Sequence, residues 1–168
     1  KHMPGHGRTT CDTHKALPTV SASEEELAID LAPFIALREA PIGMTGHLLF
    51  TAWDSKNPST QSPYVIEEII RRRIGFDGLL LTDDLDMEAL SGSVPERAER
   101  SILAGCDIAL NCWAKMDDMV GIVKRCGTMS EATAVRLGRA LGHTRLDGQR
   151  GAQAELLAKR DELLGLAA

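Results

Sequence analysis

Residues 75–87 read GFDGLLLTDDLDM, and this stretch decides the predicted fold. Residues 79–81 are all leucine, without polar alternation, which is typical of a strand buried on both faces of a parallel sheet. The strand is expected to stop at a group of acids, Asp83, Asp84 and Asp86. Carboxylates at the carboxyl end of a buried parallel strand lie where such folds place their chemistry. One acid could merely cap a following short helix, but a single cap does not explain the whole group, so a functional site is predicted here.

The composition is that of an acidic, moderately apolar chain. Of its 168 residues, 43% are hydrophobic but only 4% are aromatic, so we expect one core built mainly from aliphatic side chains. The formal net charge of -5 argues against general nucleic-acid binding, which needs a basic patch. No stretch approaches the roughly 20 consecutive apolar residues of a membrane span. We therefore expect neither nucleic acid nor a membrane among its partners.

The cysteines give a weak indication of the compartment. The chain has four of them, without a CxxC pair or a dense framework, which favours reduced thiols in a cytosol-like compartment. The first residue is Lys1 rather than methionine, so the lack of a signal peptide says little about targeting. We expect a segment to be missing before Lys1, and we expect the protein to be cytoplasmic.

Residues 1–14, KHMPGHGRTTCDTH, carry the second candidate site. Proline and glycine prevent a helix here, and three histidines lie among the other polar groups. A metal site is disfavoured because this non-helical segment offers no helical i, i+4 face for the histidines and Asp12 is the only acidic ligand nearby. A solvated polar loop is one interpretation. The other is a mobile catalytic loop, in which an extended chain places Asp12 and His14 on one face and the carboxylate holds and polarises the imidazole.

The remaining chain alternates between helical and strand patterns. Helices are predicted at residues 21–37, 62–74, 93–103, 116–125, 130–141 and 152–164, and strands at 41–50, 79–81 and 105–111. Strict alternation implies right-handed crossovers and a parallel sheet, either open and doubly wound or part of a β/α barrel. Periodicity does not choose between these, and the three strands alone cannot close a barrel, which needs eight. His47, near the end of the first strand, fits a pocket and a satisfied core position about equally well.

Two motifs resemble those of one enzyme family. Lys-His-Met-Pro-Gly-His-Gly at residues 1–7, followed by Asp-Thr-His at 12–14, resembles the KHFPGHG…D-S-H signature of family 3 glycoside hydrolases of the β-N-acetylglucosaminidase type. GFDGLLLTDDLDM resembles the same family's GFDG…SDDLxM segment. The resemblance covers residues 1–141. The mild departures are Met3 for Phe, Thr13 for Ser and Thr82 for Ser.

The resemblance implies a fold of the α/β class, a (β/α)8 TIM-type barrel, of which this chain carries roughly the C-terminal half. Residues 1–142 are expected to form that half of the catalytic barrel, with three complete strands, and residues 143–168 a C-terminal helical extension of the same domain. The first half of the barrel supplies, in the family, an Asp and an Arg that grip the sugar. Activity is therefore expected only together with the N-terminal half of the same barrel.

The resemblance also implies a retaining glycosidase that hydrolyses terminal β-linked N-acetylglucosamine, with a peptidoglycan-derived carbohydrate as substrate and without a metal or cofactor. Asp83 matches the nucleophile, His14 the general acid/base and Asp12 its partner in a dyad. The residues expected to bind the sugar are Lys1, His2 and Met87. The chemistry is consistent, since one carboxylate attacks the anomeric carbon while an imidazole exchanges a proton near neutral pH.

Three alternatives remain open. Asp84 and Asp86 after an apolar strand superficially fit the paired carboxylates of metal-dependent phosphoryl-transfer proteins, although that interpretation leaves residues 1–14 unexplained. The chain could also be a non-catalytic sugar-binding fragment. Within the family a phosphorylase is conceivable, because a neutral imidazole tolerates an incoming phosphate better than a carboxylate does.

Overall fold

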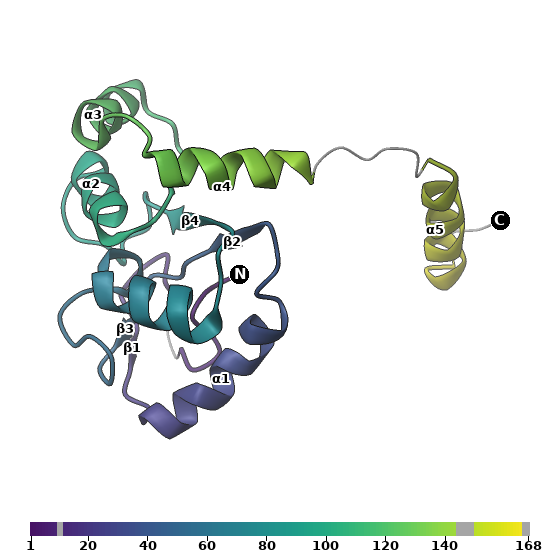
Figure 1. The fold of residues 1–168 in the computed structure, drawn as a ribbon, viewed down its shortest axis with the longest axis horizontal. Coiled ribbons are helices and arrows are strands. Elements are labelled where there is room, and N and C mark those ends of the chain that lie inside the picture. Colours follow the sequence, from purple (N-terminus) through teal and green to yellow (C-terminus); the bar gives the residue numbers. More distant parts are fainter. Residues whose placement is uncertain (10–11, 144–149, 166–168) are drawn as a thin grey trace.

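The computed structural model describes residues 1–9, 12–143 and 150–165 of the chain. At its centre is a parallel sheet in the order β2–β4–β5, of which Figure 1 labels β2 and β4. These strands span Ile42–Met44, Leu79–Asp84 and Ile108–Leu110. Met3 extends the sheet on the far side of β2 through a bridge to Thr45. In the described part of the chain the strands form an open sheet and do not close into a barrel.

The strand predicted over residues 41–50 is divided in the structure. Its first part is β2, and its last part is β3 (Leu49–Phe50). β3 pairs with β1 (Thr19–Val20) in a separate two-stranded parallel sheet, which the sequence did not indicate. The prediction of a single continuous strand is therefore wrong.

Hydrogen bonds to Gly46 explain the division. The Gly46 N–H donates to the Met3 carbonyl at 2.9 Å, and the Gly46 carbonyl accepts from the Ser59 hydroxyl at 2.5 Å. The last backbone bond from this segment to β4 is the one from Thr45 N–H to the Leu81 carbonyl, at 2.9 Å. Because the Gly46 groups are bound to these two partners, the segment leaves β4 here and β3 starts in another direction.

The predicted helices are present in the structure. They are α1 (Glu24–Ala36), η2 (Val65–Ile74), α2 (Val94–Ala104), α3 (Met116–Cys126), α4 (Glu131–Gly142) and α5 (Arg150–Leu163), with a short 3-10 helix, η1 (Ser59–Gln61), before η2. η2 differs from expectation because its hydrogen bonds are of the π type. Among the described residues, none of these helices is long and apolar enough to cross a membrane.

Capping boxes fix where two of the helices begin. Ser23 precedes α1, and its N–H donates to the Glu26 carboxylate at 2.8 Å. Ser93 precedes α2 and makes the equivalent bond to Glu96 at 2.9 Å. These contacts span three residues, so the starts of both helices follow directly from the sequence.

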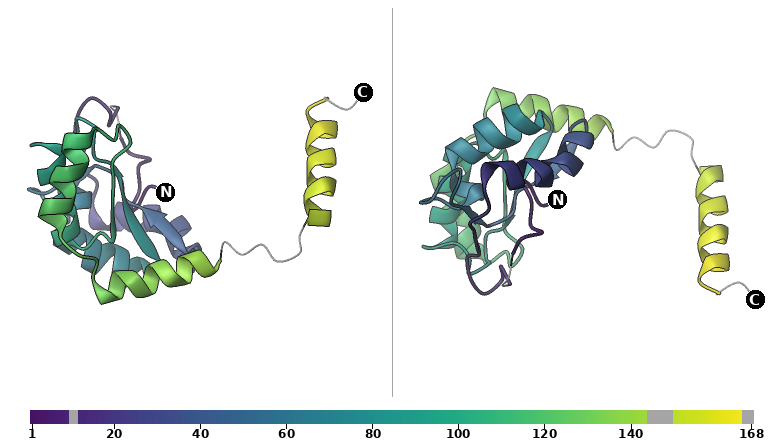
Figure 2. Two further views of the ribbon diagram at one scale, coloured as in Figure 1. Left: turned by 90° about the horizontal axis from the view of Figure 1, so that it is seen from above. Right: turned by 90° about the horizontal axis from the view of Figure 1, so that it is seen from below.

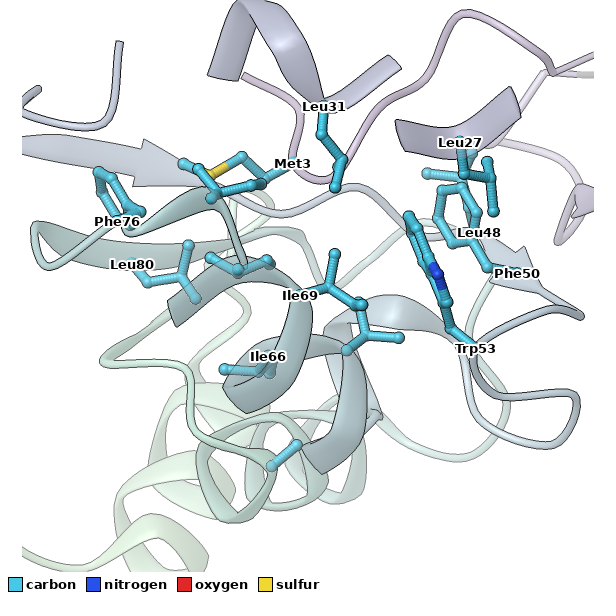
Figure 3. Close-up of a cluster of buried hydrophobic side chains, with 14 of the residues drawn as sticks. Met3, Leu27, Leu31, Leu48, Phe50, Trp53, Ile66, Ile69, Phe76 and Leu80 are labelled. Carbon is cyan, nitrogen blue, oxygen red and sulfur yellow. The ribbon is translucent and has the colours of Figure 1, made fainter. Parts of the chain in front are cut away.

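The main core lies between η2, α1 and the sheet, as Figure 3 shows. One face of η2 is fully buried and consists of Val65, Ile66, Ile69, Ile70 and Ile74. It shares this core with Leu80 of β4 and with Leu27 and Leu31 of α1. Met3 is part of the same core and is only 5% exposed. Burial of its side chain contributes about 1.5–3 kcal/mol to the free energy of unfolding. Burial of Met3 anchors the first residues of the chain beside β2.

A buried carboxylate, that of Asp107, stabilises the end of the sheet where its strands begin. One oxygen of Asp107 accepts from the Arg71 guanidinium at 2.8 Å and from the Leu80 N–H at 2.9 Å. The other accepts from the Thr133 hydroxyl at 2.8 Å and from Arg136 at 3.1 Å. These partners belong to η2, β4 and α4, so one side chain holds three elements together. Both views of Figure 2 show α4, in light green, at the end of the sheet opposite the purple N-terminal loop.

The segment after β4 forms turns rather than the short helix considered for this position. Arg97 of α2 donates to the carbonyls of Leu85 at 2.8 Å and Met87 at 3.0 Å. A guanidinium therefore satisfies carbonyls that have no helical partner, and the turn that carries Met87 is held in place by α2.

Candidate active site

A hollow of about 480 Å³ lies at the carboxyl end of β4. The side chains that line it come from the N-terminal loop and from the end of β4 with the turn that follows, and they are Lys1, His2, His6, Asp12, Thr13, His14, Asp83 and Met87. All six residues that the sequence singled out as candidate site residues are in this set. The fold thus brings together two segments that lie about 70 residues apart in the chain.

Asp83 lies within the strand and not after it. β4 continues through Asp84, so the expectation that the strand stops at the acids is wrong. Oδ1 of Asp83 accepts from the Asp84 N–H at 2.9 Å, while Oδ2 lies 3.5 Å from Nε2 of His2. One carboxylate oxygen is thus held by the backbone, and the other faces the hollow beside an imidazole.

His2 is a partly buried imidazole next to that carboxylate. Burial lowers the pKa of His2, and the charges of Lys1 and His6 act in the same direction, while the Asp83 carboxylate opposes them. The net direction is downward, which favours a neutral ring at neutral pH. A neutral imidazole can donate one hydrogen bond and accept another.

Asp12 and His14 form a hydrogen-bonded pair. Oδ1 of Asp12 accepts from Nδ1 of His14 at 2.9 Å and from the His14 backbone N–H at 3.0 Å. The backbone here is a turn, closed by bonds from Lys15 and Ala16 to the Asp12 carbonyl, and not the extended chain that the sequence suggested. The turn still joins the two side chains. The bonds from His14 lower the pKa of the Asp12 carboxyl.

This geometry assigns different tasks to the two ring nitrogens of His14. Nδ1 is directed to Asp12, so Nε2 is the atom available for exchanging a proton across the hollow. The His14 side chain is 75% exposed, and the His14 carbonyl accepts from the Glu88 N–H at 3.3 Å. The pair is therefore tied to the turn after β4 while its imidazole stays open to the hollow.

His6 and Thr13 are lining residues that the site prediction missed. Nε2 of His6 is 3.4 Å from the Thr13 hydroxyl, and Nδ1 is 3.1 Å from the Thr9 hydroxyl. The His6 ring also lies 5.6 Å from the His2 ring, between centroids. His6 thus connects the part of the loop that holds His2 to the part that holds the Asp12–His14 pair. Its place in the KHMPGHG motif was the available signal, but it was considered only as a metal ligand.

Asp84 and Asp86 serve as anchors for the loop after β5. Oδ1 of Asp84 accepts from the Cys112 N–H at 3.0 Å, and Oδ2 of Asp86 accepts from the Trp113 N–H at 3.0 Å. Neither residue lines the hollow. Within the described ranges, no group of three or more His, Cys, Asp and Glu side chains is arranged to hold a metal ion. Backbone anchoring explains both carboxylates, so the phosphoryl-transfer interpretation gains no support.

Fold and site together define a class of protein. The described strands pair in parallel, and a carboxylate and a His–Asp pair lie at the carboxyl end of β4, where β/α-barrel enzymes carry their active sites. The model of the glycosyl hydrolase family 3 N-terminal domain matches residues 1–139, and the chain belongs to this family.

Curated relatives agree with this assignment. The chain is 40% identical over 120 residues to a β-hexosaminidase of Tolumonas auensis, covering 67% of this chain and 35% of the relative. It is 44% identical over 117 residues to a β-hexosaminidase of Neisseria gonorrhoeae, covering 67% and 32%. The chain thus spans about a third of the length of these relatives.

Solved structures show the same similarity in three dimensions. A family 3 β-N-acetylglucosaminidase from Paenibacillus superposes with a TM-score of 0.73 at 36% identity, over 84% of this chain and 29% of that structure. NagZ from Neisseria gonorrhoeae, in complex with N-trifluoroacetyl-D-glucosamine, gives a TM-score of 0.70 at 33% identity, over 92% and 48%. The predicted family and the predicted fold, part of a barrel, are confirmed.

Proposed function

We propose that this chain supplies the nucleophile and the acid/base pair of a retaining glycosidase that removes terminal β-linked N-acetylglucosamine. The observation that carries the proposal is the hollow at the end of β4, where Asp83 and the Asp12–His14 pair line one space. A carboxylate fixed in a strand and an imidazole fixed by a carboxylate are the two groups that a double-displacement mechanism needs. The names of the similar proteins support the choice of sugar.

In the first step, Oδ2 of Asp83 attacks the anomeric carbon as the bond from that carbon to the leaving oxygen breaks. His14 gives its Nε2 proton to the leaving oxygen, and the Asp12 carboxylate stabilises the orientation of the ring through Nδ1–H. The product is a glycosyl ester on Asp83 and a released alcohol. Lys1, His2 and Met87 line the same hollow and are proposed to hold the sugar.

In the second step, water replaces the leaving group. Neutral His14 accepts a proton from the water as its oxygen attacks the anomeric carbon, and the ester bond to Asp83 breaks with its electron pair returning to the carboxylate. The exposure of His14 suits a loop that completes the site only after the sugar has bound, because water is then excluded during the first step.

The wider context is proposed in the same way. Residues 1–142 are assigned to the C-terminal half of the catalytic barrel, and residues 143–168, which include α5, to a helical extension of the same domain. The partner of this half is the N-terminal half of the same barrel. We propose peptidoglycan-derived fragments in the cytoplasm as the natural substrates.

A comparison of two aryl glycosides tests the proposed function. In the full-length gene product, kcat/KM for a nitrophenyl N-acetyl-β-glucosaminide should exceed that for the nitrophenyl β-glucoside about 10²-fold or more, because a site built for the acetamido group leaves polar atoms unpaired without it. Steady-state kinetics with both substrates measures this ratio. Equal rates would contradict the proposed sugar, and acceleration by added phosphate would identify a phosphorylase instead.

Substitution of the proposed acid/base should depend on the leaving group. We expect His14→Ala to lower kcat/KM about 10²- to 10⁴-fold for N-acetylglucosaminides with alkoxide leaving groups, because these need a proton. The decrease in kcat/KM should be below about 10-fold for nitrophenyl substrates, because nitrophenolate leaves without being protonated. A series of leaving groups of graded pKa measures this dependence.

Lys15→Ala is the matched control for that series. Lys15 is exposed and lies next to His14, and its backbone N–H, which the substitution retains, donates to the Asp12 carbonyl. Its rates should stay within about twofold of the wild type for every leaving group. A uniform loss across the series in His14→Ala would make His14 a binding residue and not the proton donor.

A further inference from the structure

A buried polar cluster is hydrogen-bonded to the end of β4, next to Asp83. It consists of His47 with Thr45, Ser59 and Thr60, and we call it the His47 cluster; each of the four residues is 0% exposed. Burying polar groups is costly unless they are hydrogen-bonded. Nδ1 of His47 lies 2.8 Å from the Thr60 hydroxyl, and Nε2 lies 3.0 Å from the Asp84 carbonyl. Both ring nitrogens are therefore satisfied, and one of them reaches the end of β4.

The direction of these hydrogen bonds follows from the partners. The Asp84 carbonyl can only accept, so Nε2 of His47 carries the hydrogen. Burial lowers the pKa of His47, which favours the neutral ring and makes Nδ1 an acceptor for the Thr60 hydroxyl, whose distance to Nδ1, 2.8 Å, is shorter than its 3.1 Å to the Gly46 carbonyl. The Thr60 oxygen in turn lies 2.8 Å from the Thr45 hydroxyl, which can donate to it. The result is a chain of hydrogen bonds that runs from Thr45 to Asp84.

The regular backbone pairing of β4 is interrupted where Asp83 lies and resumes on the β5 side with the bond from the Leu85 N–H to the Leu110 carbonyl, at 2.9 Å. On the β2 side, the last backbone bond is accepted by Leu81. On the β5 side, the register shifts between Leu81 and Asp84, so the ladder is irregular there as well. His47 takes up the Asp84 carbonyl three residues beyond the last backbone bond on its side. The His47 side chain thus provides a hydrogen bond to β4 beyond the point where the backbone bonds from β2 end.

Asp84 transmits this support to Asp83. Its carbonyl is held by His47, and its N–H donates to Oδ1 of Asp83, which leaves Oδ2 at 3.5 Å from His2. The same cluster also fixes the segment that carries His2. The Ser59 hydroxyl donates to the Gly46 carbonyl, and the Gly46 N–H donates to the carbonyl of Met3, the residue next to His2. The two segments that meet at Asp83 and His2 therefore rest on one buried cluster.

We propose that His47 is a positioning residue, which sets the place of the Asp83 carboxylate relative to His2 by donating from Nε2 to the Asp84 carbonyl. The role of Asp83 as nucleophile rests on the proposed function, whereas the positioning itself does not. Misplacing a reacting group by about 1 Å costs on the order of 10²-fold in rate, so a hydrogen bond to the residue next to Asp83 can have a large effect.

Two amide substitutions separate positioning from simple filling of space. Asn and Gln are both polar and uncharged, but only Gln is long enough to bring its N–H near the position of Nε2. In the full-length gene product we expect His47→Asn to lower kcat for the nitrophenyl N-acetyl-β-glucosaminide about 10- to 100-fold with KM changed less than about threefold. His47→Gln should recover kcat to within about threefold of the wild type.

The titration of His2, followed by NMR of its ring protons, gives a readout that needs no turnover. The Asp83 carboxylate raises the pKa of His2, so its displacement in His47→Asn should move the titration midpoint of His2 downward. His47→Gln should restore the wild-type midpoint. Lys1 and His6, which also act on the pKa of His2, are unchanged in both variants.

Thr133→Val controls for loss of stability. Thr133 is also buried and hydrogen-bonded, but it binds Asp107 at the opposite end of the sheet, where the strands begin. It should lower Tm while kcat per folded molecule and the His2 midpoint stay as in the wild type. The proposal is overturned if Asn and Gln at position 47 give the same kcat and the same His2 midpoint. A wild type that does not hydrolyse the sugar would refute the proposed function, and the His2 midpoints would still decide the positioning role.

Discussion

Asp83→Asn should abolish turnover of N-acetyl-β-glucosaminides by the full-length gene product, lowering kcat about 10³-fold or more while Tm changes little. Asn has the shape of Asp and can still accept from the Asp84 N–H, so the fold of β4 is preserved. It lacks the carboxylate that forms the ester with the anomeric carbon in the proposed mechanism. Kinetics with the nitrophenyl substrate, together with a thermal melt of both proteins, measures the two effects.

Labelling identifies the reacting acid directly. A fluorinated N-acetylglucosamine that traps the glycosyl-enzyme should modify Asp83, and mass spectrometry of the digested protein locates the label. Asp86→Asn is the matched control: it makes the same change nearby, in a residue that anchors the Trp113 N–H and does not line the hollow. We expect kcat of Asp86→Asn to stay within about threefold of the wild-type kcat. A label on Asp84 or Asp86 would show that another carboxylate is the nucleophile.

Asp107→Ala should be the most destabilising single substitution among the polar residues discussed, costing about 3–5 kcal/mol. The Asp107 carboxylate is 3% exposed in its side chain and neutralises Arg71, whose own side chain is 10% exposed. Removing it leaves the Arg71 guanidinium buried without its ion-pair partner and also frees the Leu80 N–H and the Thr133 hydroxyl. Urea unfolding of the full-length gene product, compared with the wild type, gives the free energy.

Asp77→Ala is the control for burial. The Asp77 side chain is 67% exposed and also forms ion pairs with two arginines, Arg136 and Arg139. Because solvent screens exposed pairs, this variant should lose no more than about 1 kcal/mol. Equal losses in the two variants would mean that the buried position of Asp107 does not determine its contribution.

Local patterns were sufficient for most of the secondary structure. Ser23 with Glu26 and Ser93 with Glu96 specify helix starts within a few residues of chain, and the apolar face of η2 follows from its spacing. The run at residues 79–81 correctly indicated a strand in a parallel sheet, with Leu79 and Leu80 buried and Leu81 half-buried. Such features are readable because the interacting groups are neighbours in sequence.

The site residues could be selected from sequence because they lie in two contiguous motifs. Residues 1–14 and 75–87 each group reactive side chains, and the resemblance to a family assigned a role to each. The sequence does not reveal the role of His6, because its partners, the hydroxyls of Thr9 and Thr13, come close to it only when the loop is folded. The structure does place the two motifs around one hollow.

The sequence by itself therefore determined the alternation of helices and strands, the family and the candidate chemistry of Asp83 and the Asp12–His14 pair. The tertiary structure alone decided that the strand predicted at 41–50 breaks at Gly46, that β4 continues through its acids, and that His47 bonds to the Asp84 carbonyl. These outcomes depend on hydrogen bonds between residues that are 13 to 43 positions apart in the chain. Partners at such separations are chosen by how the chain folds back on itself, and no local pattern records that choice.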